Sequence, residues 1–298
     1  MGSGYSAPKE TLEKPWRIMD WSESNRDTMN WNLAHSKPNS KVKRLRILLI
    51  GPVGSGKSSF INSVNTTLQF RQVCNAAVDA QGGTSFTMKY TTYKVKKGED
   101  DDFSFVFNDI MGLEEDSKTL QTSEKGMKEK VASKGVQISD IISAMQGHVP
   151  EGYTFDPENE LTSECNEYVK NPSLDEKVHC LVHVLPGDKI TIMSDNIIAK
   201  MRTVREKARD LEIPQVVVMS MVDKACPMVS GDLKKIEKSR KINEKILECH
   251  NRLGVPLNCI FPVQNYSKKL ENNKDMDTLI LTAMKHIVNL ANDYVDRI

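Results

Sequence analysis

Short apolar runs alternate with longer amphipathic stretches from about residue 45 to the end of the chain. The runs with the pattern of strands are 45–50, 85–95, 103–108, 178–185, 215–220 and 258–263. Strands that alternate with helices along a chain form a parallel sheet with helices on both faces. The pattern therefore predicts a doubly wound α/β domain with a mostly parallel sheet.

Two kinds of strand can be distinguished by their polarity. Segments 45–50 and 215–220 are mostly apolar, as central strands covered on both faces must be. Segment 85–93 instead alternates apolar with polar residues and places Met88 and Tyr90 on one face. This alternation predicts a strand at the edge of the sheet.

Helices are predicted in the gaps between the strands. One follows Lys57, another spans about 230–253, and a last one covers 276–294, where apolar residues recur at steps of three and four. The stretch 146–177 contains prolines and many acids and has little periodicity. We expect this stretch to be an insertion on the surface of the domain.

The first 40 residues are polar and hold the tryptophans Trp16, Trp21 and Trp31. An arm of this kind usually packs its aromatic side chains onto the domain that follows, and the alternative is a surface on which a partner docks. The sequence thus divides into an N-terminal tryptophan-bearing arm (1–40) and an α/β domain (41–298) that carries the insertion.

Composition narrows the classes of partner. The 41 Lys and Arg residues nearly balance the 40 Asp and Glu residues, so no global field favours nucleic acid or an anionic membrane. The six cysteines form no C-x-x-C pair, and no apolar run reaches the roughly 20 residues needed to cross a bilayer. A cytoplasmic protein with reduced thiols fits this composition. The first six residues also match an acylation pattern at Gly2, and the alternative there is a plain flexible tail.

One segment carries a phosphate-binding motif. Residues 51–58 fit G-x-x-x-x-G-K-[ST], with an apolar strand before them and an amphipathic helix after them. The glycines let backbone N–H groups converge on phosphate oxygens at the positive end of the helix. Lys57 is expected to reach the β- and γ-phosphates of a nucleoside triphosphate, and Ser58 is expected to ligate Mg²⁺. The nucleotide-binding residues predicted in this region are Gly51, Val53, Gly54, Ser55, Gly56, Lys57, Ser58 and Ser59.

Further ligands for the metal and the γ-phosphate are predicted downstream. Asp109 and Gly112 form a D-x-x-G pattern after strand 103–108, where an acid can hold Mg²⁺ and a glycine N–H can contact the γ-phosphate. The alternative for Asp109 is an ordinary turn residue. Thr84, with Thr87 behind it, is expected to offer a hydroxyl to Mg²⁺ and the γ-phosphate. The predicted metal ligands are thus Ser58, Thr84 and Asp109.

The base is expected to be read by Asp223, just after strand 215–220. Guanine offers two donors that one carboxylate accepts together, whereas adenine places an acceptor there. Small GTPases carry N-K-x-D or T-K-x-D at this place, and this chain has Ser-Met-Val-Asp at 220–223. Because Met221 replaces the lysine that covers the base, an ATPase stays an alternative.

These motifs resemble the interferon-induced protein 44 group of vertebrate GTPase-like proteins, including its 44-like members. The likeness runs from about residue 15 and is carried by segments 15–17, 46–52, 56–60, 172–174, 178–180 and 265–267. The resemblance implies a GTP-binding, interferon-inducible cytoplasmic protein of antiviral defence, and longer relatives with an extra N-terminal domain. Members of the group also lack the lysine before Asp223. Small GTPases close over the base after their last strand, so we expect Asn265 near guanine.

Hydrolysis is expected to be slow or absent. Ras-like enzymes place a glutamine after D-x-x-G to orient the attacking water, and this chain has Leu113 there. No residue is assigned a catalytic role. The sequence predicts a guanine-nucleotide switch or assembly module of innate immunity, with GTP or GDP and Mg²⁺ bound, and with a second copy or an immune-signalling protein as partner. The alternative is an interaction protein in which nucleotide binding is vestigial or structural.

Overall fold

The computed structural model describes residues 10–38, 40–76, 88–98, 101–123, 126–132, 134–267 and 271–298. Its centre is a six-stranded sheet in the order β2-β3-β1-β6-β7-β8. These strands are β1 (Leu45–Ile50), β2 (Thr91–Lys96), β3 (Asp102–Asp109), β6 (Cys180–Pro186), β7 (Gln215–Ser220) and β8 (Ile260–Pro262). β2 runs antiparallel to β3, and the other neighbouring pairs of this sheet are parallel. The predicted α/β class with a mostly parallel sheet is confirmed.

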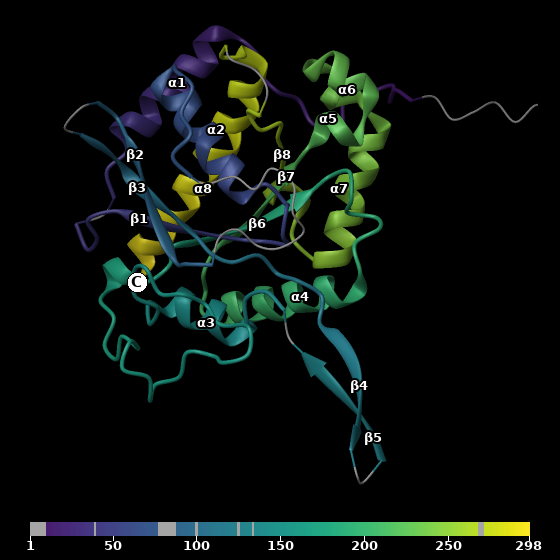
Figure 1. Cartoon of the computed structure of the whole chain (residues 1–298). Coiled ribbons are helices and arrows are strands. Elements are labelled where there is room, and N and C mark those ends of the chain that lie inside the picture. The colour runs from purple at the N-terminus through teal and green to yellow at the C-terminus, as the bar shows by residue number, and fades with distance from the viewer. Residues whose placement is uncertain are drawn as a thin grey trace, which may run out of the picture.

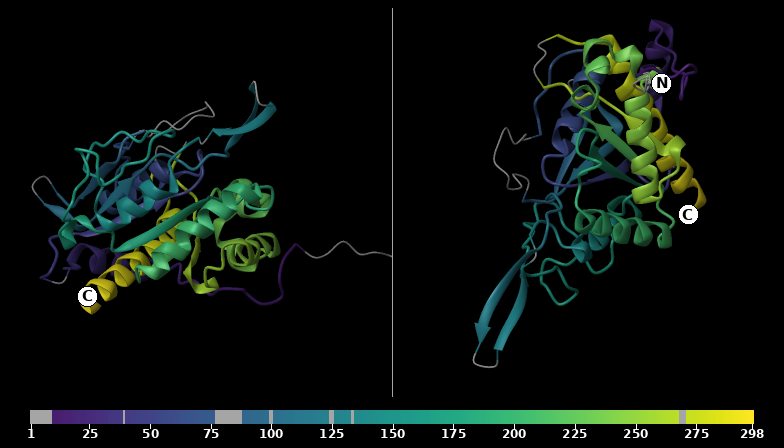
Figure 2. Two further views of the ribbon diagram at one scale, coloured as in Figure 1. Left: turned by 90° about the horizontal axis from the view of Figure 1, so that it is seen from below. Right: turned by 90° about the vertical axis from the view of Figure 1, so that its right-hand side faces the viewer.

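Helices cover both faces of this sheet (Figures 1 and 2). One layer holds α1 (Glu23–His35), α2 (Lys57–Gln69) and α8 (Lys274–Arg297), and the other holds α3 (Ile138–Gln146), α4 (Asp195–Asp210) and α7 (Arg240–Leu253). The shorter helical elements are α5 (Val222–Ala225), α6 (Pro227–Gly231), η1 (Leu174–Glu176), η2 (Leu233–Lys238) and η3 (Leu257–Cys259). A hairpin of β4 (Ser117–Ser123) and β5 (Gly126–Ala132) extends away from the body (Figure 2).

Burial accounts for the central strands. Arg46 is the one residue of β1 that is not fully buried, and every residue of β6 is buried. Ile47 lies in register between Phe107 of β3 and Cys180 of β6. Each large apolar side chain buried in this way contributes about 1.5–3 kcal/mol. The central strands therefore hold the carboxyl end of β1, where loop 51–58 begins, in a fixed position.

The strand predicted at 85–95 forms in part. Residues 85–87 lie outside the described residues, and β2 runs along the edge of the sheet from Thr91, as its alternation indicated. Of the two residues predicted to share a face, Tyr90 is buried and Met88 is exposed, so the burial expected for an apolar face is found at Tyr90 alone. Tyr90 N donates to Tyr153 O at 2.8 Å, so this part of the chain pairs with the stretch predicted as an insertion rather than with β3.

The single helix predicted over 230–253 is also wrong, since α6, η2 and α7 share that region. Asp232 accepts a hydrogen bond from Lys234 N, and Ser239 accepts one from Ile242 N. Each side chain caps the start of a new helical segment, as Asp and Ser commonly do. Two capping residues inside one periodic pattern therefore divide it into separate elements.

The N-terminal arm packs two of its three tryptophans. Trp16 Nε1 donates to Ile236 O at 2.6 Å, and Trp21 Nε1 donates to the Glu237 carboxylate at 2.8 Å. Trp31 is 62% exposed and stacks on His35. It lies on α1, a helix that the sequence analysis did not predict and that packs against α8.

Candidate functional site

Loop 51–58 joins the carboxyl end of β1 to the amino end of α2. A Cβ atom on Gly51 would collide with the carbonyl oxygen of Val184, so the loop passes too close to β6 for a side chain there. Gly56, at the start of α2, has φ of 93° and supplies no capping side chain. The first N–H groups of α2 are therefore left for a ligand, and the helix end favours an anion.

Lys57 is buried at this helix end. Its Nζ donates to Gly51 O at 3.3 Å. Burial lowers the pKa of Lys57, and the nearby Asp109 carboxylate raises it by a smaller amount. Because the buried Lys57 ammonium has one long hydrogen bond and only a partial charge partner in Asp109, a phosphate group would be a suitable ligand for it.

Asp109 ends β3 beside β1 and lies next to Ser58. Ser58 Oγ donates to Asp109 Oδ2 at 2.7 Å, whereas Asp109 Oδ1 is buried and has no hydrogen-bond partner among the described residues. Burial raises the pKa of Asp109, and Lys57 and Ser58 lower it by smaller amounts. A hydroxyl and a carboxylate with a free oxygen are ligands that Mg²⁺ accepts, so these residues fit the predicted metal.

The segment after Asp109 is bound to the phosphate loop through its backbone. Leu113 N donates to Gly51 O at 3.0 Å, and Val53 N donates to Leu113 O at 3.1 Å. Gly112 packs so closely that an added Cβ would lie 2.7 Å from Val53 Cγ2. The Leu113 side chain is 1% exposed and belongs to the hydrophobic core.

The far end of this segment is held by α4. Lys200 Nζ donates to Glu114 O at 2.8 Å and to Asp116 Oδ1 at 2.6 Å. We refer to residues 112–116 as the post-β3 segment. Lys200 could not be predicted from sequence, because a contact across 84 residues leaves no signal in local spacing.

Residues near the predicted base site contact the loop directly. Ser220 Oγ donates to Ser55 O at 2.6 Å, and Asn265 Nδ2 donates to Gly56 O at 3.2 Å. The oxygen atoms Asn265 Oδ1 and Ser55 Oγ are buried without a hydrogen-bond partner in the described residues. The carboxyl end of β7 and the chain after β8 therefore meet the phosphate loop.

Asp223 lies in α5, directly after β7, and is half-buried. Met221 precedes this helix with φ of 58°, a conformation that L-residues seldom adopt. Ser220 was not predicted as a site residue, although its place in the Ser-Met-Val-Asp stretch was recognised. Thr84 and Gly2 lie outside the described residues.

The strand order, the glycine-rich loop after β1 and the carboxylate at the end of β3 together define a P-loop, GTPase-like α/β domain. The site lies at the carboxyl ends of the strands, beside β1, where neighbouring connections leave toward opposite faces.

No helix among the described residues is long and apolar enough to cross a membrane.

The sequence of the chain is similar to those of several curated proteins. It is 31% identical to human interferon-induced protein 44 over 258 residues and 30% identical to human interferon-induced protein 44-like over 256 residues. Each alignment covers 86% of this chain and 54% or 53% of the relative, so the chain spans about half the length of the curated relatives it matches. The relationship to the interferon-induced protein 44 group is therefore confirmed. No protein-family model matches the chain.

Two solved structures overlap loosely with the chain. Toc33 from Arabidopsis thaliana, a dimerization-deficient mutant, is 13% identical, with a TM-score of 0.43 over 93% of this chain and 94% of that one. A probable GTP-binding protein, engB, is 14% identical, with a TM-score of 0.41 over 85% of this chain and 100% of that one. At these scores the fold class rests on the strand order and loop described above.

Proposed function

We propose that loop 51–58 binds a guanine nucleotide with Mg²⁺ and that the chain acts as a nucleotide-dependent switch or assembly module. The observation that supports this most directly is a set of buried polar groups with unmet bonding capacity around one loop. Asp109 Oδ1 and Ser55 Oγ have no hydrogen-bond partner in the described residues, and Lys57 has one long contact. Buried polar groups are normally paired, so such a concentration points to a ligand.

Each residue around the loop has a proposed role. Lys57 contacts the β- and γ-phosphates, and the backbone N–H groups of Gly54 and of 56–59 surround the phosphate oxygens, while Val53 N and Ser55 N are bonded to Leu113 O and Pro52 O. Ser58 and Asp109 ligate Mg²⁺, with Thr84 as the third protein ligand. When bound, the metal neutralises phosphate charge.

The base end of the site is proposed to be selective for guanine. Asp223 accepts from N1–H and the 2-amino group, and Asn265 lies near the base. Ser220 and Asn265 support this arrangement because both bond to the phosphate loop, which fixes the base-binding segments relative to the phosphates. Met221 leaves the face of the base without the usual lysine stem, which weakens the discrimination against adenine.

The nucleotide is proposed to act mainly through binding. The buried Leu113 cannot orient water, so intrinsic hydrolysis is slow or absent unless a second copy supplies a polar group. A switch is supported by the post-β3 segment, whose Gly112 is the proposed γ-phosphate contact and whose Leu113 bonds to the loop. A γ-phosphate bound at loop 51–58 would therefore contact Gly112, and in this way it would influence the position of the post-β3 segment.

The cellular setting is proposed from the relatives. Their names describe interferon-induced proteins, and we infer a cytoplasmic, interferon-inducible protein of antiviral innate immunity with a second copy or an immune-signalling protein as partner. The alternative is an interaction protein with vestigial or structural nucleotide binding. The departures at Met221 and Leu113 favour that alternative over a fast enzyme.

The direct test is to purify the protein, denature it and identify the released nucleotide by chromatography. GDP or GTP in near-stoichiometric amount is the expected result. Adenine nucleotide alone would favour the ATPase alternative. An empty protein that also fails to bind added Mg-GTP would favour the interaction protein and contradict the proposed function.

A further inference from the structure

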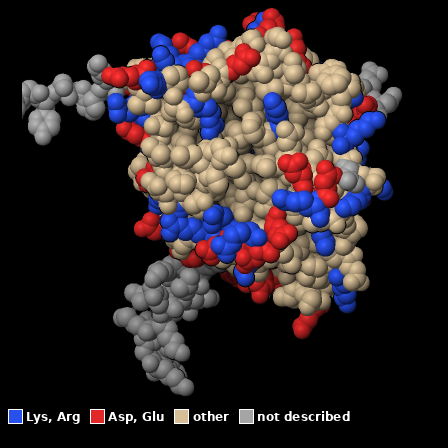
Figure 3. All heavy atoms as spheres, turned by 180° about the vertical axis from the view of Figure 1, so that it is seen from behind, with Lys and Arg blue, Asp and Glu red and all other residues tan. Residues whose placement is uncertain are grey.

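A cavity lies away from loop 51–58, between the sheet and the stretch that follows α3. The face in Figure 3 mixes basic and acidic side chains, so it singles out no partner, whereas this cavity has a defined lining. Its volume is about 480 Å³, and a neighbouring cavity of about 360 Å³ shares Arg46, Thr92, Lys94 and Glu176 with it. Arg46 lies about 16 Å before Gly51 along the strand, so the two sites are separate.

Arg46 lines this cavity from β1, and its hydrogen bonds all go to uncharged groups. Its Nε donates to Asp175 O at 3.1 Å, and its Nη1 donates to Asn108 Oδ1 at 3.1 Å and to Thr92 Oγ1 at 3.3 Å. All three acceptors are neutral. No ion pair of the half-buried Arg46 is found within 4.0 Å among the described residues, although the Glu176 carboxylate lies near enough to interact with it electrostatically.

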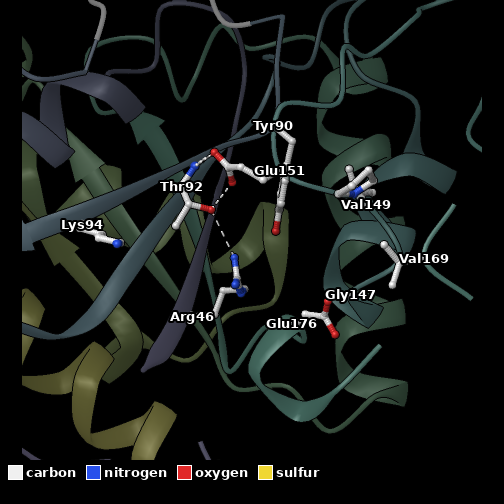
Figure 4. A pocket seen from close by; sticks show the side chains of 10 residues that line it. Arg46, Tyr90, Thr92, Lys94, Gly147, Val149, Glu151, Val169 and Glu176 are labelled. Carbon is white, nitrogen blue, oxygen red and sulfur yellow. Dashed lines mark hydrogen bonds between the residues drawn. The ribbon is translucent and has the colours of Figure 1, made fainter. Parts of the chain in front are cut away.

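Tyr90 and Lys94 from the edge of the sheet add further donors. Figure 4 shows the Tyr90 hydroxyl and the Arg46 guanidinium extending toward one space, with Val149, Val169 and Glu176 across from them. Burial raises the pKa of Tyr90 to about 12, so its hydroxyl keeps its proton. Lys94 is exposed and, among the described residues, forms no ion pair.

Two acids, Glu151 and Glu176, line the cavity, and each accepts hydrogen bonds from a neighbouring residue. Glu151 accepts from Thr92 N at 2.9 Å and from the Thr92 hydroxyl. Glu176 accepts from Ser173 N at 2.6 Å and Ser173 Oγ at 2.8 Å. Both carboxylates keep their negative charge, but both residues are exposed, whereas Arg46 is half-buried and Tyr90 is buried. The less exposed polar groups of the lining are therefore the donors of Arg46 and Tyr90.

We propose that this cavity is a second ligand site, which binds a small organic molecule through a carboxylate or phosphate group. Arg46, Tyr90 and Lys94 hold the oxyanion by charge-assisted hydrogen bonds, the kind that is strongest in a partly buried setting. Val149 and Val169 cover the carbon part of the ligand. This site does not depend on the nucleotide loop, so the proposal stands apart from the proposed function.

The test measures binding of two probes, inorganic phosphate and citrate, by calorimetry and by ligand-observed NMR. All proteins carry Lys57→Ala, so that phosphate held by the nucleotide loop does not contribute. Tyr90→Phe and Lys94→Gln remove one donor each. Lys97→Gln is the matched control, because Lys97 lies just beyond β2 and pairs with Asp101 outside the cavity.

We expect at least one probe to bind the Lys57→Ala protein, with affinity about tenfold lower after Tyr90→Phe or Lys94→Gln and unchanged after Lys97→Gln. Circular dichroism checks that each variant is folded. Failure of both probes to bind at tens of millimolar would overturn the proposal. So would binding that neither Tyr90→Phe nor Lys94→Gln weakens.

Discussion

Lys57 and Asp109 bring opposite charges into the buried end of the nucleotide loop. Burial lowers the pKa of Lys57 and raises that of Asp109, and each side chain offsets part of the other's shift. Both shifts disfavour the charged forms in the free protein. Phosphate beside Lys57 and Mg²⁺ beside Asp109 would oppose both shifts, which agrees with the proposed ligands.

Base selectivity is proposed to depend on Asp223. We predict that Asp223→Asn weakens GTP binding about tenfold or more, because each hydrogen bond to a charged group contributes about 1.5–3 kcal/mol. Xanthosine triphosphate should gain relative to GTP, since an amide can donate to the 2-oxo group of xanthine. Competition binding measures both effects. If ATP competes as well as GTP in the parent protein, Asp223 does not read guanine.

Local spacing predicted the residues of loop 51–58 and Asp109, and the structure places them together. It did not predict Ser220 or Lys200 as parts of the site. Their hydrogen bonds to Ser55 and Asp116 depend on how distant segments pack, which no short motif encodes. Motif reasoning therefore finds residues whose role is set by their neighbours in sequence and misses those set by the fold.

At the scale of elements, the post-β3 segment holds Leu113 with its side chain buried. We predict that Leu113→Gln does not accelerate GTP hydrolysis, because that side chain points into the core. The buried amide should instead lower the free energy of unfolding by about 1–3 kcal/mol. Urea unfolding and single-turnover assays measure the two effects.

Leu113→Met is the matched control, since it conserves volume and should cost less than about 1.5 kcal/mol. A large rise in hydrolysis after Leu113→Gln would show that this residue can face the phosphates, contrary to the structure.

Two buried histidines lie in or beside strand β6: His183 is within the strand, and His179 comes directly before it. Burial lowers the pKa of His183 and of His179 to about 4. A histidine kept neutral in the folded state binds a proton on unfolding, so its stabilising contribution is present above about pH 6.5 and is lost as the pH falls toward 4. The pKa of Asp140 is raised to about 6, so its contribution has the opposite sign: it increases the stability of the folded state as the pH falls from about 6 to 4.

We therefore predict that the stability advantage of the parent over His183→Gln shrinks by about 1.4 kcal/mol per pH unit between about pH 6.5 and 4. Comparison with the variant isolates His183 from Asp140 and His179. Urea unfolding of the nucleotide-free proteins at several pH values provides the measurement. A difference that stays constant with pH would mean that His183 is not held neutral.

The elements themselves were predicted unevenly from sequence. Strands buried on both faces, such as β1 and β7, were predicted at their observed limits because burial leaves a continuous apolar run. The 230–253 helix failed because Asp232 and Ser239 interrupt it by capping, although the apolar period continues. The β4–β5 hairpin was missed because it projects from the body and its sequence carries no alternation imposed by a core.

At the scale of the whole molecule, the question is whether one copy suffices for hydrolysis. We predict that the isolated protein hydrolyses GTP at or below about 10⁻⁴ per second, the slow intrinsic range of Ras-like proteins. If a second copy completes the site, the rate per molecule should rise with protein concentration, since dimerisation follows mass action. Single-turnover assays over a hundredfold concentration range test this. Fast hydrolysis independent of concentration, and absent in Lys57→Ala, would reveal a catalytic group within one chain.

Binding of Mg-GTP at loop 51–58 is the central claim, and calorimetric titration of the parent beside Lys57→Ala tests it most directly. Lys57→Met retains the apolar part of the buried stem, and Lys189→Ala removes an exposed lysine from the turn after β6 as a control. The parent and Lys189→Ala should bind Mg-GTP, and neither Lys57 variant should bind it while both stay folded by circular dichroism. Unchanged affinity in Lys57→Ala and Lys57→Met would contradict the claim.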